Sequence, residues 1–154
     1  MKTHYYLPAA LLLLAACNKS GSDAVPRAVA ASFGQEFSLQ YRQEAMLPAV
    51  AAPELVVRVE DLQFAICPKN TNCFVPNFVA PTLGITGRDG QTQLLKVPAH
   101  DQLVINRQYP DTVSFRANGR RYVLHYTEWN LNPKKQDNPA RQDFTLSLQV
   151  EKPQ

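Results

Sequence analysis

Apolar and polar residues alternate with a period of two along much of the chain after residue 33. The last segment shows the pattern most clearly, because Phe144, Leu146, Leu148 and Val150 are separated by single polar residues. A period of two is typical of a β-strand that buries one face and exposes the other. The same pattern predicts strands over residues 37–41, 54–66, 82–86, 92–97, 102–106, 112–117 and 121–129, with 45–47 extending the first strand after a kink.

Turn-forming residues separate the predicted strands. The dipeptide Asn118-Gly119 favours a tight two-residue hairpin turn, and the segment from Gly87 to Gly90 is a second hairpin signal. Glu60-Asp61 interrupts the alternation within the long 54–66 strand, which predicts a bulge at that point. These signals indicate that neighbouring strands pair antiparallel.

The predicted elements indicate an all-β protein. Twelve prolines argue against long helices. Short strands at regular spacing, with turn signals between them, are typical of an antiparallel β-sandwich, here of about seven to nine strands. A small β-barrel is the alternative fold.

The N-terminal segment has a different character. An apolar run extends from Leu7 to Ala16 and is broken only by Pro8, behind a short front that contains Lys2. The run is shorter than the ~20 apolar residues that a permanent membrane-spanning helix needs. It matches the helical apolar region of a removable secretory signal. Residues 1–16 are therefore predicted to be a signal peptide.

The end of this run resembles the lipobox of bacterial lipoproteins. The motif is Leu14-Ala15-Ala16-Cys17, with a leucine, two small residues and the cysteine in order. The resemblance implies cleavage before Cys17, attachment of a diacylglyceryl group to its thiol and acylation of the new amine. Two or more acyl chains anchor a protein stably to a bilayer. By the Gram-negative sorting rule, Asn18 at the next position favours the outer membrane.

The resemblance divides the chain into a signal peptide (1–16), a lipidated flexible tether (17–32) and a β-sandwich domain (33–154). A short helical turn over residues 25–31 is an alternative for the end of the tether. Without the signal, 15 Lys and Arg residues face 13 Asp and Glu residues, which gives a net charge of +2. This balance gives no argument for nucleic acid as a partner, and an envelope location argues against it.

The lipoprotein resemblance assigns one of the three cysteines, Cys17, to the lipid. Cys67 and Cys73 then remain as an even pair in an oxidising compartment, which predicts a disulfide. A zinc site is one alternative, but zinc prefers four ligands, and only His100 and His125 are left to complete such a site. A redox dithiol, the other alternative, more often has Cys-x-x-Cys spacing near a βαβ pattern.

No catalytic set is evident in the sequence. It contains no Gly-x-Ser-x-Gly nucleophile elbow and no glycine-rich phosphate loop. His125 lies within a predicted strand, where it is expected to pack or to form a hydrogen bond across strands. His100-Asp101 could orient an imidazole through a carboxylate, but it follows Pro98 in an expected polar loop. We therefore predict no catalytic residue, no metal ligand and no cofactor other than the covalent lipid on Cys17.

Basic and aromatic residues suggest two contact surfaces. If the loops that carry them meet at one end of the sandwich, five basic residues form a patch for anionic lipid head groups or acidic glycans. They are Arg116, Arg120, Arg121, Lys134 and Lys135. Trp129 with Tyr122 and Tyr126 could form a carbohydrate platform. The two tyrosines share a strand face with Leu124, however, and this favours packing in the core.

The cysteine loop carries a second resemblance. Cys67-Pro68, four further residues and Cys73, after an early strand pair, are similar to small Gram-negative envelope lipoproteins of unknown function, over residues 33–97. Members often have Asp-Ser-Arg before the Cys-Pro and an aromatic-Ala-Gly after the second cysteine. This chain has Phe64-Ala65-Ile66 and Val75-Pro76-Asn77 at those places. The resemblance implies a disulfide-stapled β-domain and no particular activity.

Together these features predict a lipid-anchored protein of the cell envelope, at the outer membrane, that acts as a non-enzymatic binding or structural module. Its partner would be an envelope protein or a glycan. The alternatives are a small envelope hydrolase, a protease-inhibitor-like module, and an accessory lipoprotein of an outer-membrane assembly that docks by an edge strand. An enzyme would bring His100 or His125 together with a carboxylate in a cleft. A binding module would instead expose aromatic residues or an apolar patch.

Overall fold

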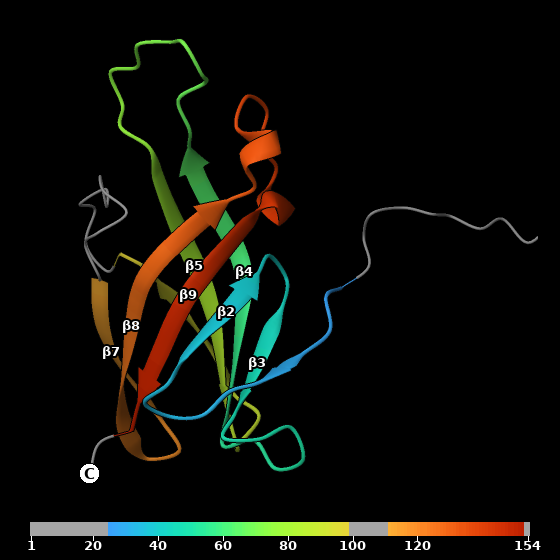
Figure 1. Ribbon diagram of the computed structural model, residues 1–154. Helices are drawn as coiled ribbons and strands as arrows, with labels where there is room; N and C mark the ends of the chain where they lie inside the picture. Colours follow the sequence, from blue (N-terminus) through green and yellow to red (C-terminus); the bar gives the residue numbers. More distant parts are fainter. Residues whose placement is uncertain (1–24, 99–110, 153–154) are drawn as a thin grey trace, which may run out of the picture.

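Two β-sheets packed face to face form the protein (Figure 1). The computed structural model describes residues 25–98 and 111–152. Four predictions therefore lie outside the described residues: the signal peptide, the lipidation site Cys17, the strand 102–106 and the pair His100-Asp101. Within the described residues, no helix is long and apolar enough to span a membrane.

The first sheet has five strands in the order β1-β3-β4-β5-β6, and the second has four in the order β2-β9-β8-β7. The strands of the first sheet are β1 (Val29–Ala30), β3 (Glu44–Leu47), β4 (Leu55–Ala65), β5 (Phe78–Gly87) and β6 (Thr92–Lys96). Those of the second are β2 (Glu36–Gln40), β7 (Asp111–Ala117), β8 (Arg120–Leu131) and β9 (Phe144–Glu151). Two short 3-10 helices, η1 (Pro133–Lys135) and η2 (Arg141–Asp143), connect β8 to β9. These nine strands of the described chain confirm the predicted sandwich, and the two separate sheets argue against the barrel alternative.

The core lies between the sheets and consists of the apolar positions that alternate along the strands. The four alternating apolar residues of β9 are at most 1% exposed, as their period of two predicts. Tyr126 in β8 reaches across the core, where its hydroxyl donates to the main-chain oxygen of Val79 in β5 at 3.1 Å. Burial raises the pKa of Tyr126, because the charged phenolate is disfavoured away from water.

Two bulges adjust which side chains face the core. The register of β4 against β5 shifts between Val59 and Asp61, which confirms the predicted bulge. A second shift, of β8 against β9, lies between Tyr126 and Glu128. It turns Trp129 to the same face as Tyr126, although the two residues are three positions apart. Trp129 is only 2% exposed, so it belongs to the core.

The segment predicted to extend the first strand belongs to the other sheet. Residues 45–47 lie in β3, which pairs with β4, whereas β2 pairs with β9. The kink is a complete reversal: Arg42 adopts a left-handed backbone with φ of 63°. Its N–H donates to the carbonyl of Val59 at 3.0 Å, which brings the chain across to β4. The predicted extension of the first strand is therefore wrong.

The ordered domain begins earlier than predicted. Val29 and Ala30, inside the expected tether 17–32, form β1 and pair in parallel with β3. Ala31 continues this contact by donating to the carbonyl of Met46 at 3.1 Å, and its side chain is buried. Val29 also packs against the core. Because Val29 and Ala31 have apolar surface to bury, the end of the predicted tether forms an edge strand and not a helical turn.

Candidate functional site

The disulfide loop projects from one end of the sandwich, between β4 and β5 (Figure 1). Cys67 and Cys73 form the predicted disulfide, with their Cα atoms 5.9 Å apart. The six-residue separation closes a small ring directly after β4. The seven residues from Cys67 to Cys73 and the four that follow, up to Asn77, are called the disulfide loop below.

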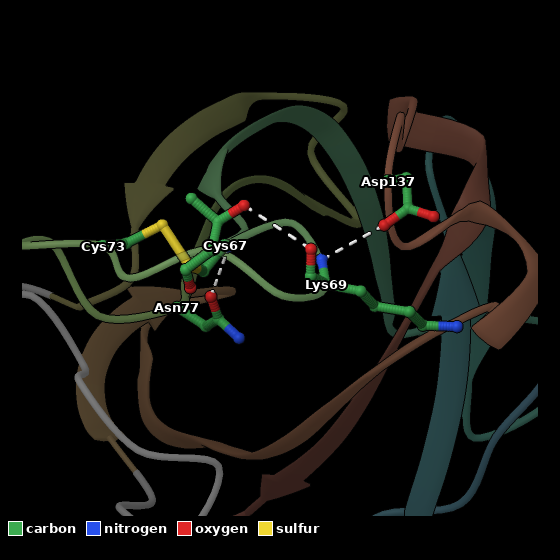
Figure 2. The surroundings of a disulfide bond; sticks show 6 residues. Cys67, Lys69, Cys73, Asn77 and Asp137 are labelled. Atoms are coloured by element: carbon green, nitrogen blue, oxygen red, sulfur yellow. Dashed lines mark hydrogen bonds between the residues drawn. A yellow bond between two sulfur atoms is a disulfide. The ribbon is translucent and has the colours of Figure 1, made fainter.

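Two hydrogen bonds shape the disulfide loop: one closes the loop on itself, and the other ties it to the rest of the domain (Figure 2). The main-chain N–H of Cys67 donates to the side-chain oxygen of Asn77 at 2.6 Å, so the start of the loop is tied to its end. The main-chain N–H of Lys69 donates to Asp137 at 3.1 Å, in the β8–β9 connection of the other sheet. The loop therefore joins β4 to β5 of the first sheet and is also hydrogen-bonded to the β8–β9 connection of the second, although it lies outside the core.

This fixed loop exposes apolar side chains to solvent. Phe74 is 106% exposed and Val75 is 49% exposed. Among the large hydrophobic residues that the described structure exposes, Phe74 is the aromatic one; the others are Val25, Val50, Val75 and Leu94. Isolated surface valines need no explanation, but an aromatic ring held fully in water on a braced loop is typical of a contact site.

A cavity of about 420 Å³ lies next to the disulfide loop. Its walls come from Ile66 just before the disulfide loop, from the last residue of the loop, from the end of β8 and from the β8–β9 connection. The lining residues are Ile66, Asn77, Trp129, Asn130, Leu131, Pro133 and Gln136. Asn77 is shared with the hydrogen bond that closes the loop, so the shape of this cavity depends on the loop conformation. Together with Phe74 and Val75, the cavity makes up the candidate site, which is called the loop site below.

The five basic residues of the predicted patch do not come together. Arg116, Arg120 and Arg121 lie where β7 ends and β8 begins, whereas Lys134 and Lys135 lie in η1, after β8 ends. The twelve residues of β8 separate the two groups by roughly 35 Å at ~3.3 Å per residue. Figure 1 shows the β7–β8 turn and η1 at opposite ends of the sandwich. The predicted patch is therefore wrong as a single surface, because the strand that joins the loops spans the whole domain.

The three aromatic residues considered as a carbohydrate platform are buried. Tyr122 and Tyr126 are at most 2% exposed, like Trp129. Their rings are packed: Tyr122 stacks on Phe115 with centroids 5.4 Å apart, and Trp129 meets Phe144 edge-on at 6.2 Å. These contacts confirm the prediction of core packing.

A buried carboxylate that the sequence analysis did not single out lies at the other end of the sandwich. Glu54, directly before β4, is only 7% exposed. Its carboxylate accepts hydrogen bonds from Lys152 at 2.8 Å and from the hydroxyl of Tyr122, and Arg88 lies 3.5 Å away. The hydrogen bonds from Lys152 and Tyr122 lower the pKa of Glu54 against the opposing effect of burial. Burial and the bond to Glu54 in turn raise the pKa of Tyr122.

This cluster was missed because its members come from separate parts of the chain. Glu54, Arg88 and Lys152 are each polar residues at a strand end, where they look like ordinary surface positions. Tyr122 is recognisable as a core residue whose hydroxyl needs a partner. The need of this buried hydroxyl for a partner is the feature of the sequence that could have predicted a buried polar group next to β8.

His125 has the cross-strand role that was predicted for it. Its Nδ1 lies 3.1 Å from the hydroxyl of Thr112, its partner residue in β7. Its Nε2 lies 3.4 Å from the carboxylate of Glu151 in β9. The three side chains lie on the outer face of the second sheet, and none of them lines the loop-site cavity. Within the described residues, no group of three His, Cys, Asp or Glu side chains could hold a metal ion.

Comparisons with known proteins found no relative: no family model, no curated protein and no solved structure matches this chain. The chemistry of its surfaces is therefore the basis for a function. Two surfaces stand out in the described structure, the apolar loop site at one end and the charged cluster around Glu54 at the other.

Proposed function

We propose that this protein is a lipid-anchored, non-enzymatic binding module of the cell envelope that contacts a protein partner through the loop site. The observation that carries this proposal is the full exposure of Phe74 on a loop braced by a disulfide. A rigid aromatic side chain loses little conformational entropy on binding and buries a large apolar area, so it is a typical anchor of protein interfaces.

A protein partner fits the loop site better than a glycan does. Sugars stack on platforms of exposed aromatic faces, but Trp129, Tyr122 and Tyr126 are packed in the core, so among the described residues Phe74 stands as a single exposed ring without such a platform. The exposed surface instead combines one aromatic ring and Val75 with a cavity whose lining is partly apolar. That combination suits an apolar side chain of a partner in the cavity, with Phe74 packed on the partner's surface.

Binding is favoured over catalysis by the placement of His125. Thr112, His125 and Glu151 supply a hydroxyl, an imidazole and a carboxylate, but they stand on the outer face of a regular sheet. A nucleophile needs a pocket that positions the substrate and donors for the developing oxyanion. Leu124 and Tyr126, on either side of His125, are paired with residues of both β7 and β9. Their main-chain N–H groups take part in the sheet and are not free to stabilise an oxyanion.

The anchor in this proposal is Cys17, through the lipobox resemblance. The chain between Cys17 and Val29 can span at most roughly 40 Å, which limits how far the domain can extend from the bilayer. A short tether of this kind concentrates the loop site near the membrane, so it favours a partner that is itself in the membrane or bound to it.

Two experiments test the proposal separately. Replacing Cys17→Ser should move the protein from the membrane fraction to the soluble fraction; a variant that is processed normally and stays membrane-bound would contradict the anchor. For the contact, Phe74→Ser should abolish co-purification of a cross-linked envelope protein from intact cells. The matched control is Val50→Ser, since Val50 is 51% exposed in the β3–β4 loop. Equal capture by both variants would contradict the loop site.

A further inference from the structure

A second cavity, of about 230 Å³, is lined mainly from the β3–β4, β5–β6 and β7–β8 connections. These connections lie at the end of the sandwich opposite the disulfide loop (Figure 1). The lining of the cavity is almost entirely polar and comes from separate loops and strand ends of both sheets. The lining residues are Glu54, Arg88, Asn118, Arg120 and Lys152. This set is called the basic cavity below. The proposed function does not use it.

The basic cavity carries an excess of positive charge. Three cationic side chains surround one carboxylate, so the lining has a net charge of +2. The Glu54 carboxylate engages Lys152 at 2.8 Å and Arg88 at 3.5 Å, and the Tyr122 hydroxyl also donates to it. Arg120 forms no ion pair with any described residue, so its guanidinium is available to a ligand.

The floor of the basic cavity is built from side-chain to main-chain hydrogen bonds. The side-chain amide of Asn118 donates to the carbonyl of Glu54 at 2.8 Å. The oxygen of the same amide accepts from the main-chain N–H of Arg88 at 2.7 Å. Asn118 therefore fixes the β3–β4, β5–β6 and β7–β8 connections to one another. Arg88 lies in the β5–β6 connection, and Arg120 begins β8 directly after the β7–β8 turn. The two arginines therefore cannot move apart without breaking the bond between Asn118 and Arg88.

We propose that the basic cavity binds a phosphate group, with Arg88 and Arg120 as its main ligands. Guanidinium groups donate paired N–H bonds to phosphate oxygens, and the net charge of +2 balances a phosphate dianion. Lys152 is paired with Glu54 at 2.8 Å. It therefore adds positive charge to the cavity wall but is not one of the main phosphate ligands. The bound group is inorganic phosphate or a phosphomonoester, including the head group of an anionic lipid such as phosphatidic acid.

Isothermal titration calorimetry of the full-length protein in detergent, at low ionic strength, tests this site. The probe is inorganic phosphate, with sodium chloride at matched ionic strength as the reference. Saturable binding should appear for phosphate. Arg120→Gln should weaken it about tenfold, the size expected for one charge-assisted contact of ~1.4 kcal/mol.

Arg121→Gln is the matched control, because it removes the same charge from the neighbouring position. The Arg121 guanidinium donates to the hydroxyl of Ser114 at 2.8 Å, and Arg121 does not line the cavity. This variant should retain affinity within about twofold. No saturable phosphate binding, or equal losses in the two variants, would overturn the proposal and leave the cluster as a structural clamp.

A short-chain phosphatidic acid, titrated in the same way, distinguishes the two sources of the phosphate. Tighter binding than inorganic phosphate, still dependent on Arg120, supports a lipid head group as the ligand. Equal affinity for the two probes supports a free phosphate or a soluble phosphomonoester. Phosphatidic acid binding that is unchanged by Arg120→Gln would contradict the site, since the lipid would then be held elsewhere.

Discussion

The side-chain amide of Asn118 donates to the main-chain carbonyl of Glu54 at 2.8 Å, across 64 positions of sequence. Asn118 has a left-handed backbone with φ of 52°, and Gly119 follows with φ of 69°. These are the positive angles that a two-residue hairpin turn requires. Asn118 thus meets two demands at once: its backbone forms the β7–β8 turn, and its side chain joins that turn to the first sheet.

Asn118→Gly separates these two roles. Glycine adopts the same backbone angles without strain, so the hairpin should form, while both side-chain hydrogen bonds are lost. We expect the free energy of unfolding to fall by about 1–2 kcal/mol. Urea denaturation measures this. Asn70→Gly is the control: Asn70 also has a positive φ, of 60°, but no described residue pairs with its side chain, and its substitution should be nearly neutral. Equal effects would contradict the linking role of Asn118.

The buried carboxylate of Glu54 should make stability depend on acid pH. The bonds from Lys152 and Tyr122 lower its pKa below the usual 4.5, so the unfolded chain takes up this proton at a higher pH than the folded protein does. The stabilisation by Glu54 is therefore present above about pH 4.5 and is lost as the pH falls through the folded-state value. Thermal unfolding followed between pH 7 and pH 3 should show this loss.

Glu54→Gln should remove that acid dependence. At neutral pH it should lower the free energy of unfolding by about 2 kcal/mol, because Lys152 loses its partner inside a half-buried cluster. Towards pH 3 the variant and the parent protein should converge. Glu128→Gln, at an exposed position of β8, should leave the pH profile unchanged. If the stability of Glu54→Gln and that of the parent protein fell in parallel as the pH was lowered, Glu54 would not be the source of the acid dependence.

Much of the fold could be predicted because half-buried strands have a period of two. The alternation located β4 with its bulge, both strands of the β7–β8 hairpin, and all four core residues of β9. The dipeptide Asn118-Gly119 predicted the turn, since few residue pairs tolerate its backbone angles. At these places the properties of neighbouring residues alone determine the local structure.

The sites could be predicted only in part, because they depend on which strand ends meet. The disulfide followed from counting cysteines, but the exposure of Phe74 depends on how the disulfide loop leaves β4. The basic patch failed because Arg120 and Lys134 lie at opposite ends of β8. Strand length and direction decide such groupings, and they are properties of the assembled sheet, which a local pattern does not contain.

Two glycines of β5 should respond differently to alanine. A Cβ at Gly87 would lie 2.8 Å from the side-chain oxygen of Asn118, which hydrogen bonds hold in place. A Cβ at Gly84 would meet the flexible end of Glu60 at the same distance. We expect Gly87→Ala to cost about 1–2 kcal/mol and Gly84→Ala less than about 0.5 kcal/mol, measured by urea denaturation. The reverse order would contradict the rigidity of Asn118.

Reduction of the Cys67–Cys73 disulfide should loosen the loop without unfolding the sandwich. The small closed ring contributes about 2 kcal/mol by the chain-entropy model, and both cysteines lie outside the core. Intact-mass analysis with and without reductant should differ by two hydrogens. The reduced protein should keep its β-sheet circular dichroism, while amide exchange should rise in the disulfide loop. Two free thiols in freshly isolated protein would contradict the pairing.

Site-specific photo-cross-linking in intact cells tests the central claim most directly. A photoreactive amino acid is placed at position 74, on the disulfide loop, or at position 50, an exposed apolar position in the β3–β4 loop. The β3–β4 loop lies at the other end of the sandwich (Figure 1). The binding proposal predicts a discrete adduct with one envelope protein from position 74 and none from position 50. No adduct from position 74, or the same adducts from both positions, would contradict it.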